Sequence, residues 1–239
     1  MTDQSSVNKK DILKKLLKWL IYAVLFFFAS TIFFVLLYRF VNPPITPLML
    51  ARDFTQVMHG EKLKMSKQWV SLDMISPDLQ LAVVASEDNL FLEHHGFDFG
   101  AIDKAKDFNE RKKGKKIHGA STISQQTAKN VFLWSGRTWV RKGLEVYFTI
   151  LIEFVWPKHR IMEVYLNVIE MGDGVYGAEM ASQYYFHKPA LRLTKPESAL
   201  LAAILPNPRK WNPVRPTGYI LSRQDWILWN MGNIGTLKY

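Results

Sequence analysis

The chain has 239 residues, a formal net charge of +10 and no cysteine. Without cysteine, disulfides and thiolate metal sites are excluded, although the redox compartment stays undecided. The charge would suit nucleic acid, but five of the lysines directly precede an apolar run and no nucleic-acid motif accompanies the basic cluster at 104–116. We therefore expect no nucleic-acid partner, because anionic lipid head groups or a lipid-linked phosphate account for the same charge. For residues 112–116 an exposed, solvated loop is the alternative.

The first apolar segment runs from Trp19 to Tyr38 without a charged residue. It matches the roughly 20 residues that a helix needs to cross a bilayer. Lysines precede it and Arg39 is the only close positive charge after it, so residues 1–18 should stay in the cytoplasm. A cleaved signal peptide is the alternative, but its apolar core would be shorter, about 7 to 15 residues, and no convincing cleavage site follows Leu37. We expect an uncleaved transmembrane helix over residues 19–38.

The next segment, residues 39–47, contains three prolines and should form a stiff, extended linker. Each proline fixes its own φ and biases the preceding residue away from helix. Residues 48–239 remain, which is enough for one ordinary domain with a real core. The topology alone places this domain outside the cytoplasm, in the periplasm.

The outer domain is predicted to be mainly α-helical. Apolar residues recur at helical spacing in six segments, which are residues 77–86, 122–132, 140–155, 160–168, 177–186 and 195–205. Thr194 is a plausible N-cap, since Pro196 and Glu197 follow it in the first turn. Residues 57–70 could form a short strand or a loop pair. Residues 171–174 and 206–208 indicate loops, and no alternating run is strong enough to predict a sheet.

Residues 86–97 place an acidic pair directly behind the apolar run 81–85. A carboxylate at the end of an apolar helix can be partly desolvated, which makes it a better base near neutral pH. Glu87 is therefore the first candidate for a catalytic base. The alternative is that Glu87 and Asp88 mark the place where a core helix reaches solvent.

Residues 119–130 form a second informative segment. Gly119 and Ala120 allow close backbone approach, and the hydroxyl residues after them can cap a helix whose N-terminus can hold an anion. Polar side chains at spacings of three and four then share one helix face, namely Thr122, Gln125, Gln126 and Lys129. Such a stripe is either the solvent side of the helix or a surface for sugar hydroxyls and phosphate.

A third segment, residues 137–145, enters a strongly apolar helix with Arg141 one turn before Glu145. The simplest interpretation of this spacing is a weak intrahelical ion pair. Glu153 and Glu163 are further acids on predicted helices, and either could be structural.

Together these segments resemble the ordered motifs of the peptidoglycan glycosyltransferases of family 51, which polymerise lipid II. The motifs are Glu-Asp-x-x-Phe-x-x-His-x-Gly at 87–96, Gly-Ala-Ser-Thr-Ile-Ser-Gln-Gln-x-Ala-Lys-Asn at 119–130, Arg-Lys-x-x-Glu at 141–145 and Tyr-Leu-Asn at 165–167. The resemblance continues through Gly-Asp-Gly-Val-Tyr-Gly at 172–177 to Asn-Pro at 212–213. Several motifs in this order are far more specific than any one of them alone.

The resemblance implies a lysozyme-like glycosyltransferase domain over residues 48–239, with a smaller lobe that touches the membrane. No room remains for a C-terminal transpeptidase domain, so a monofunctional member is expected. Such an enzyme would sit in the inner membrane and meet lipid II, the growing glycan strand and membrane lipids. Other cell-wall synthesis or division proteins are further expected partners.

The resemblance also implies a role for each matched residue. Glu87 matches the general base for the 4-hydroxyl of the acceptor N-acetylglucosamine, whose oxygen attacks C1 of the donor N-acetylmuramic acid. Glu145 matches a second glutamate that acts at the donor pyrophosphate, directly or through a divalent ion. The basic positions that hold this pyrophosphate are matched by Lys129, Arg137 and Arg141. The polar positions that line the cleft are matched by Asp88, Ser121, Thr122, Gln125, Gln126 and Asn130.

One departure from the family concerns a cofactor. Where some relatives carry a lysine just before the second glutamate, this chain has Leu144. A cation there must come from Arg141, Lys142 or a metal, and no dedicated His or carboxylate cluster is apparent. Whether Mg²⁺ or Mn²⁺ acts at Glu145 is therefore left open, and no other cofactor is expected.

Two further sets of residues are expected to have structural or membrane-facing roles. His94 and His95 are expected to be structural, because a hydrogen-bonded corner fits the glycine that follows them. The surface that dips into the bilayer is expected at Leu133, Trp134 and Trp139.

Two rival functions stay open beside the polymerase. A lytic muramidase must expel a poor alkoxide and needs a protonated acid, whereas a pyrophosphate leaving group needs charge neutralisation. The cations that accompany Glu87, namely Lys129, Arg137 and Arg141, favour glycosyl transfer. The second rival is a non-catalytic, membrane-anchored scaffold for wall assembly.

Overall fold

The computed structural model describes residues 9–60, 62–112, 119–136 and 138–239. The chain divides into two compact units, Met1–Val41 and Asn42–Tyr239. The first unit contains the helix α1 (Lys9–Phe40), which includes the predicted span 19–38. Among the described residues, α1 is the one helix that is long and apolar enough to cross a membrane. This finding fits a single-pass membrane anchor.

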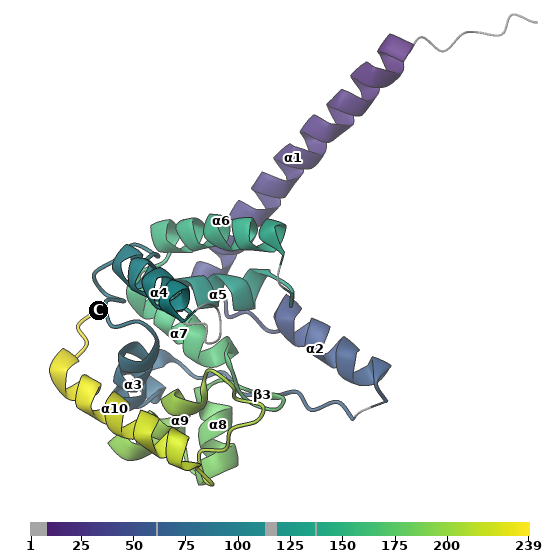
Figure 1. Cartoon of the computed structure of the whole chain (residues 1–239). Coiled ribbons are helices and arrows are strands. Elements are labelled where there is room, and N and C mark those ends of the chain that lie inside the picture. Colours follow the sequence, from purple (N-terminus) through teal and green to yellow (C-terminus); the bar gives the residue numbers. More distant parts are fainter. Residues whose placement is uncertain (1–8, 61, 113–118, 137) are drawn as a thin grey trace, which may run out of the picture. The chain divides into compact units, whose positions relative to one another are not determined.

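The second unit is mainly α-helical, as predicted (Figure 1). Its helices are α2 (Pro47–Met58), α3 (Pro77–Glu87), α4 (Phe99–Arg111), α5 (Ile123–Phe132), α6 (Trp139–Val155), α7 (Lys158–Val168), α8 (Ala178–Phe186), α9 (Lys195–Ile204) and α10 (Gly218–Ile234). Short 3-10 turns lie at Leu72–Met74 and Ala190–Arg192. The strands are β1 (Ser66–Lys67), β2 (Glu170–Gly172) and β3 (Val175–Tyr176).

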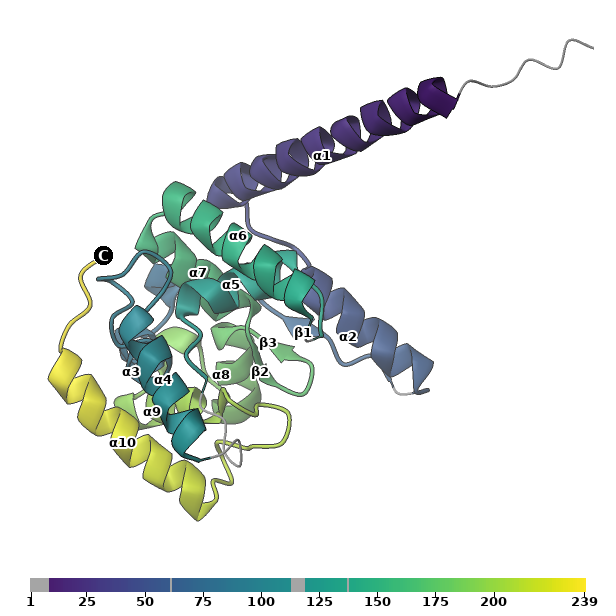
Figure 2. The same cartoon turned by 45° about the horizontal axis from the view of Figure 1, so that its top comes forward.

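The core of this unit is built around α3, α5, α7 and α9. The helix α3 packs against α9 and α10, while α5 packs against α6 and α7. Figure 2 shows α6 lying across α5 and α7. Side chains such as Leu79, Ile123 and Leu166 are fully buried. Each such side chain contributes about 1.5–3 kcal/mol through removal of apolar surface from water.

Local sequence signals fix where several helices begin. Thr194 is the N-cap of α9, as predicted, and forms a capping box with Glu197. Thr122 caps α5 in the same way, with Gln125 as its partner. These reciprocal bonds satisfy backbone N–H groups that the first helical turn leaves unpaired. The N–H groups of Thr122 and Gln125 are therefore satisfied by side chains of their own segment.

The structure corrects one of the two predicted loops, whereas residues 206–208 form turns and bends as predicted. Residues 171–174, predicted as a loop, form part of the β2–β3 hairpin, which β1 extends in parallel to a three-stranded sheet. The strands have only two or three residues each, too few for an alternating pattern to stand out. Gly174 turns the hairpin at φ +75, and a Cβ there would lie 1.6 Å from the Lys64 carbonyl oxygen. Only glycine fits this approach.

Candidate active site

Glu87 is the last residue of α3, whose preceding turns are buried in the core. Its side chain is 16% exposed. One carboxylate oxygen, Oε2, accepts a hydrogen bond from Gln126 Nε2 at 3.0 Å. The other, Oε1, accepts from Ser86 Oγ at 3.2 Å and lies 3.6 Å from Arg223 Nη2. Glu87 is thus a partly buried carboxylate that accepts hydrogen bonds from α3 and α5 and faces a guanidinium of α10.

A buried tyrosine orients the amide that faces Glu87. Tyr165 donates its hydroxyl to Gln126 Oε1 at 3.3 Å, which turns the Gln126 amino group toward the carboxylate. Burial raises the pKa of Tyr165 well above its ordinary value, and the nearby negative charges of Glu87 and Asp88 raise it further. Tyr165 therefore stays a neutral donor at all ordinary pH values.

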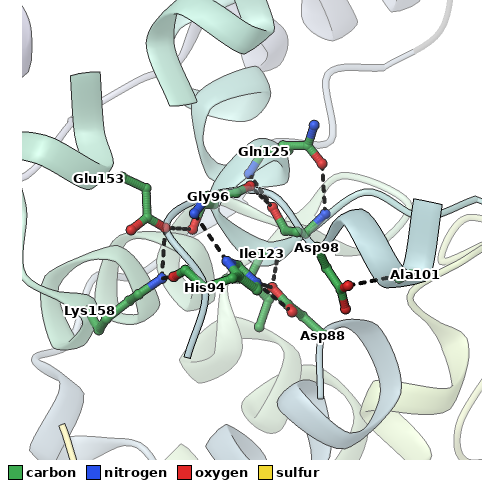
Figure 3. A network of polar contacts seen from close by, with 11 residues as sticks. Asp88, His94, Gly96, Asp98, Ala101, Ile123, Gln125, Glu153 and Lys158 are labelled. Carbon is green, nitrogen blue, oxygen red and sulfur yellow. Dashed lines mark hydrogen bonds and ion pairs between the residues drawn. The ribbon is translucent and has the colours of Figure 1, made fainter. Parts of the chain in front are cut away.

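Asp88 joins the loop after α3 to the start of α5 (Figure 3). Its two oxygens lie 2.8 and 3.0 Å from His94 Nε2, and Oδ2 accepts from the Ile123 backbone N–H at 2.9 Å. His94 Nδ1 accepts from the Gly96 N–H, so Nε2 carries the proton that Asp88 accepts. The predicted structural role of His94 fits this contact. Asp88 borders the cavity, but its carboxylate is already engaged in holding the loop.

Thr122 and Gln125 are also engaged in holding this loop. Thr122 Oγ1 donates to the Gly96 carbonyl at 2.7 Å, and Gln125 Oε1 accepts from the Thr122 N–H at 3.0 Å. Both residues are buried, whereas Gln126 and Lys129 are half-buried. The expected polar stripe is therefore divided into two parts. Thr122 and Gln125 form a buried helix cap, and Gln126 and Lys129 are half-buried.

Glu153 and Glu163 have structural partners. Glu153 accepts from Lys158 Nζ at 2.8 Å and from Ser124, and Lys158 also donates to the His94 carbonyl at 2.7 Å (Figure 3). Glu163 pairs with Arg160 and accepts from the Leu72 N–H. Neither glutamate lines the cavity that contains Glu87.

Glu145 lies in a second, cationic part of the site on α6. It is buried, with only 4% of its surface exposed. Oε2 accepts from Arg141 Nη1 at 2.9 Å, which is the predicted intrahelical pair, and Oε1 accepts from Lys142 Nζ at 2.5 Å. The buried Nε of Arg141 has no hydrogen-bond partner among the described residues. Arg137, the other expected cation of this segment, lies outside the described residues.

Lys129 links the two glutamates electrostatically. Burial lowers the pKa of its ammonium, Glu145 and Glu87 raise it, and Arg141 and Lys142 lower it. A single ammonium on α5 therefore lies within range of the charges of both glutamates.

A cavity of about 680 Å³ opens beside Glu87. It is bounded by the end of α3, by α4 and by the loop at 119–122, and Lys104 and Trp226 line it. Ser121 is exposed at its edge, whereas Asn130 is buried on α5. The cavity lies in the size range of small-molecule sites, so Glu87 has room for a sugar beside it.

The position considered for a divalent ion is the carboxylate of Glu145. Both oxygens already face the cationic groups of Arg141 and Lys142. Across the part of the chain that the structure describes, no three His, Cys, Asp or Glu side chains come together as a metal-ligating group. The described residues therefore offer no all-protein metal cage, although Mg²⁺ is commonly held by one or two carboxylates together with substrate phosphates.

The expected membrane-facing surface is corrected in part. Leu133 is only 1% exposed and belongs to the core. Trp134 is half-exposed, and Trp139 is 92% exposed at the start of α6. Further along α6, Ile150 and Phe154 are also exposed, the latter at 90%. Because Trp139, Ile150 and Phe154 lie close to helical spacing on α6, this helix presents one apolar stripe outward.

Three residues near Glu87 were not predicted: Tyr165 as a donor, and Arg223 and Trp226 on α10. The helix α10 was itself not predicted. Its buried face includes Ile220, Ile227 and Met231, and Arg223 interrupts this apolar series. A charged residue within an apolar stripe is the signal that could have identified Arg223.

Comparison with known proteins places the chain in a family. Residues 55–232 match the family model described as "Transglycosylase". A protein of Bdellovibrio bacteriovorus, named biosynthetic peptidoglycan transglycosylase, is 58% identical over 88% of this chain and 84% of its own length. Relatives of the same name from Bacteroides thetaiotaomicron and Escherichia coli are each 55% identical. They cover 90% and 80% of this chain, and 86% and 79% of their own lengths, respectively.

The family model covers well over half of the chain, and the relatives share more than half of their aligned residues with it. The expected lysozyme-like, mainly helical fold is the fold of this family. The chain therefore belongs to the transglycosylase family and is a peptidoglycan glycosyltransferase.

Proposed function

We propose that this enzyme polymerises lipid II into linear glycan strands, with Glu87 as the general base. The observation that carries the proposal is the placement of one partly buried carboxylate beside a cavity, within electrostatic range of the half-buried ammonium of Lys129. A base at the cavity and cations beyond it fit a reaction that activates a hydroxyl and expels an anion.

In the proposed reaction, Glu87 accepts the proton of the acceptor N-acetylglucosamine 4-hydroxyl. The oxygen forms a bond to C1 of the donor N-acetylmuramic acid as the bond from C1 to the pyrophosphate oxygen breaks. Attack from the opposite face inverts the α-linked donor to a β-linked glycan. Undecaprenyl diphosphate leaves as an anion, and the proton stays on Glu87 until it passes to solvent.

The cationic side chains stabilise the leaving group in this scheme. Lys129 and Arg141 are buried or partly buried, so their charges act through a medium of lower dielectric than water. Arg137 is assigned to the same group by its position in the sequence. Glu145 keeps Arg141 and Lys142 in place, because both cations bind its carboxylate. A pyrophosphate would then meet preorganised positive charge, which costs no reorganisation during the reaction.

A location at the membrane fits the proposed reaction. Lipid II carries a polyprenyl chain that stays in the bilayer, so the enzyme has to work at the membrane surface. The apolar helix α1 fits a single-pass anchor, and we place its N-terminus in the cytoplasm and the catalytic domain in the periplasm. The exposed stripe of α6 would lie against the outer leaflet of the inner membrane.

The proposal is tested by giving the purified full-length protein two substrates. With labelled lipid II we expect polymeric glycan and released undecaprenyl diphosphate. With finished sacculi we expect no soluble muropeptides. Muropeptide release without polymerisation would favour the muramidase, and inactivity on both substrates would favour the scaffold.

A further inference from the structure

We propose that Arg223 of α10 is a positioning residue for Glu87, an inference that rests on the proposed function. Arg223 Nη2 lies 3.6 Å from Glu87 Oε1 and donates to Ser86 Oγ at 3.0 Å. The Ser86 hydroxyl in turn lies 3.2 Å from the same Glu87 oxygen. The guanidinium thus reaches the carboxylate both directly and through one hydroxyl.

The hydroxyl of Ser86 is directed toward Glu87 by these contacts. Its oxygen accepts from Arg223, so its single proton can go only to Glu87 Oε1 or to the Ala202 carbonyl at 3.4 Å. The bond to the carboxylate is the shorter of the two and is charge-assisted. Arg223 therefore favours the rotamer of Ser86 that holds Glu87.

The helix α10 is fixed on the end of α3 that carries Glu87. Asn230 donates to the Ala85 carbonyl at 2.7 Å, two residues before the base. Ile227 and Met231 are buried on the same face of α10, one turn or more beyond Arg223. Because apolar packing and Asn230 fix this face, the guanidinium has little freedom to move away from Glu87.

The two oxygens of Glu87 are consequently held from opposite sides of the site. Gln126 of α5 binds Oε2, and Arg223 of α10 acts on Oε1. The Nε of Arg223 is buried and has no hydrogen-bond partner among the described residues. Trp226, one turn away, lines the cavity, so this face of α10 borders the substrate space.

The first test compares steady-state kinetics of full-length variants on lipid II. Arg223→Gln should lower kcat on the order of 10²-fold with KM within about twofold, because a misplaced base affects the chemical step. Arg223→Lys should recover part of this loss, since it keeps the charge but not the guanidinium geometry. The matched control Arg215→Gln removes the same charge from an exposed position of the preceding loop and should behave as wild type. A rise in KM with unchanged kcat would overturn the inference.

The second test does not depend on activity. The test compares crystal structures of the wild type and of Arg223→Gln. In the wild type the Glu87 carboxylate should contact Gln126, and in the variant it should be rotated away from that position. An unmoved carboxylate in a folded Arg223→Gln variant would overturn the positioning role. Inactive wild-type protein with a displaced Glu87 in the variant would instead refute the polymerase proposal and leave the positioning role standing.

Discussion

Glu87 and Glu145 differ in their immediate neighbours. Glu87 contacts one amide, one hydroxyl and one guanidinium at 3.6 Å, and it borders a cavity. Glu145 has both oxygens in ion pairs with cations from its own helix. In the proposed mechanism the first carboxylate can therefore meet a substrate hydroxyl, while the second organises positive charge.

Substitution Glu145→Gln tests this second role. The amide would leave Arg141 and Lys142 without their shared counter-charge, so both side chains should lose their fixed positions. We expect a severe loss of kcat on lipid II, on the order of 10²-fold. A pure weakening of binding with unchanged turnover would contradict the proposed catalytic role.

Lys129 provides a pH prediction. Burial lowers the pKa of its ammonium below the ordinary value of 10.5. The cationic form is present below that pKa and is lost as pH rises through it. The value of kcat/KM should therefore begin to fall at an alkaline pH below 10.5, the ordinary pKa of lysine. In Lys129→Arg the guanidinium stays charged, and the alkaline limb of kcat/KM should move to higher pH even if activity is lower. An unmoved alkaline limb would show that another group controls it.

At the scale of elements, the junction of the loop at 88–96 with α5 and α6 holds the active site together. Gly96 adopts φ +93, and a Cβ there would lie 2.8 Å from Thr149 Cγ2 and 3.0 Å from Glu153 Cγ. Its carbonyl accepts from Thr122 and its N–H donates to His94. The loop can therefore close over α6 only with glycine at this position.

Gly96→Ala should destabilise the fold by about 1–3 kcal/mol, because backbone strain and a steric clash coincide. Thermal unfolding of the full-length protein measures this as a lower Tm. Gly143→Ala is the matched control, since a Cβ at Gly143 on α6 meets nothing within 4 Å. The control should keep or slightly raise Tm. Equal Tm values for the two variants would contradict the account of this junction.

The sequence predicted those helices whose apolar residues are buried at regular spacing. The predicted starts of the helices at 77, 122, 195 and 177 differ from the observed ones by at most one residue, since a proline or a cap marks several of them. The helix α4 was not predicted, and Ala105 is its one buried residue. The strands have too few residues to show alternation.

The active site was predictable where its motifs are local. Glu87, Glu145 and Lys129 lie in segments whose residue types and order suggested chemistry. The contact between Arg223 and Glu87 was not predicted. It depends on how α10 packs against α3, and a local sequence pattern does not predict a contact between residues 136 positions apart. The separation of the Thr122 and Gln125 cap from Gln126 and Lys129 likewise follows from tertiary packing.

At the scale of the whole molecule, α2 and α6 of the catalytic unit are among the helices that expose apolar side chains. Beside the stripe of α6, α2 exposes Leu50, Phe54 and Val57, which recur at helical spacing. Contiguous exposed apolar surface is typical of membrane or partner contacts. We propose that both stripes meet the bilayer, so that the active site stays close to its lipid-linked substrate.

The absence of native cysteine allows a single spin label to test this placement. We predict that a nitroxide on Phe154→Cys, in the full-length protein in vesicles, is accessible to oxygen and shielded from a water-soluble nickel complex. A label on Tyr219→Cys, at an exposed position of α10, should show the reverse. Equal accessibility of both labels to nickel would contradict membrane contact by α6.

The base assignment at Glu87 is tested most directly by the rate of lipid II polymerisation in Glu87→Gln. The amide cannot accept the acceptor proton, so we predict a loss of turnover of about 10²–10⁴-fold with an unchanged Tm. Glu93→Gln is the control, because it makes the same change at an exposed position of the same loop and should polymerise as wild type. Polymerisation by Glu87→Gln at the wild-type rate would contradict the assignment.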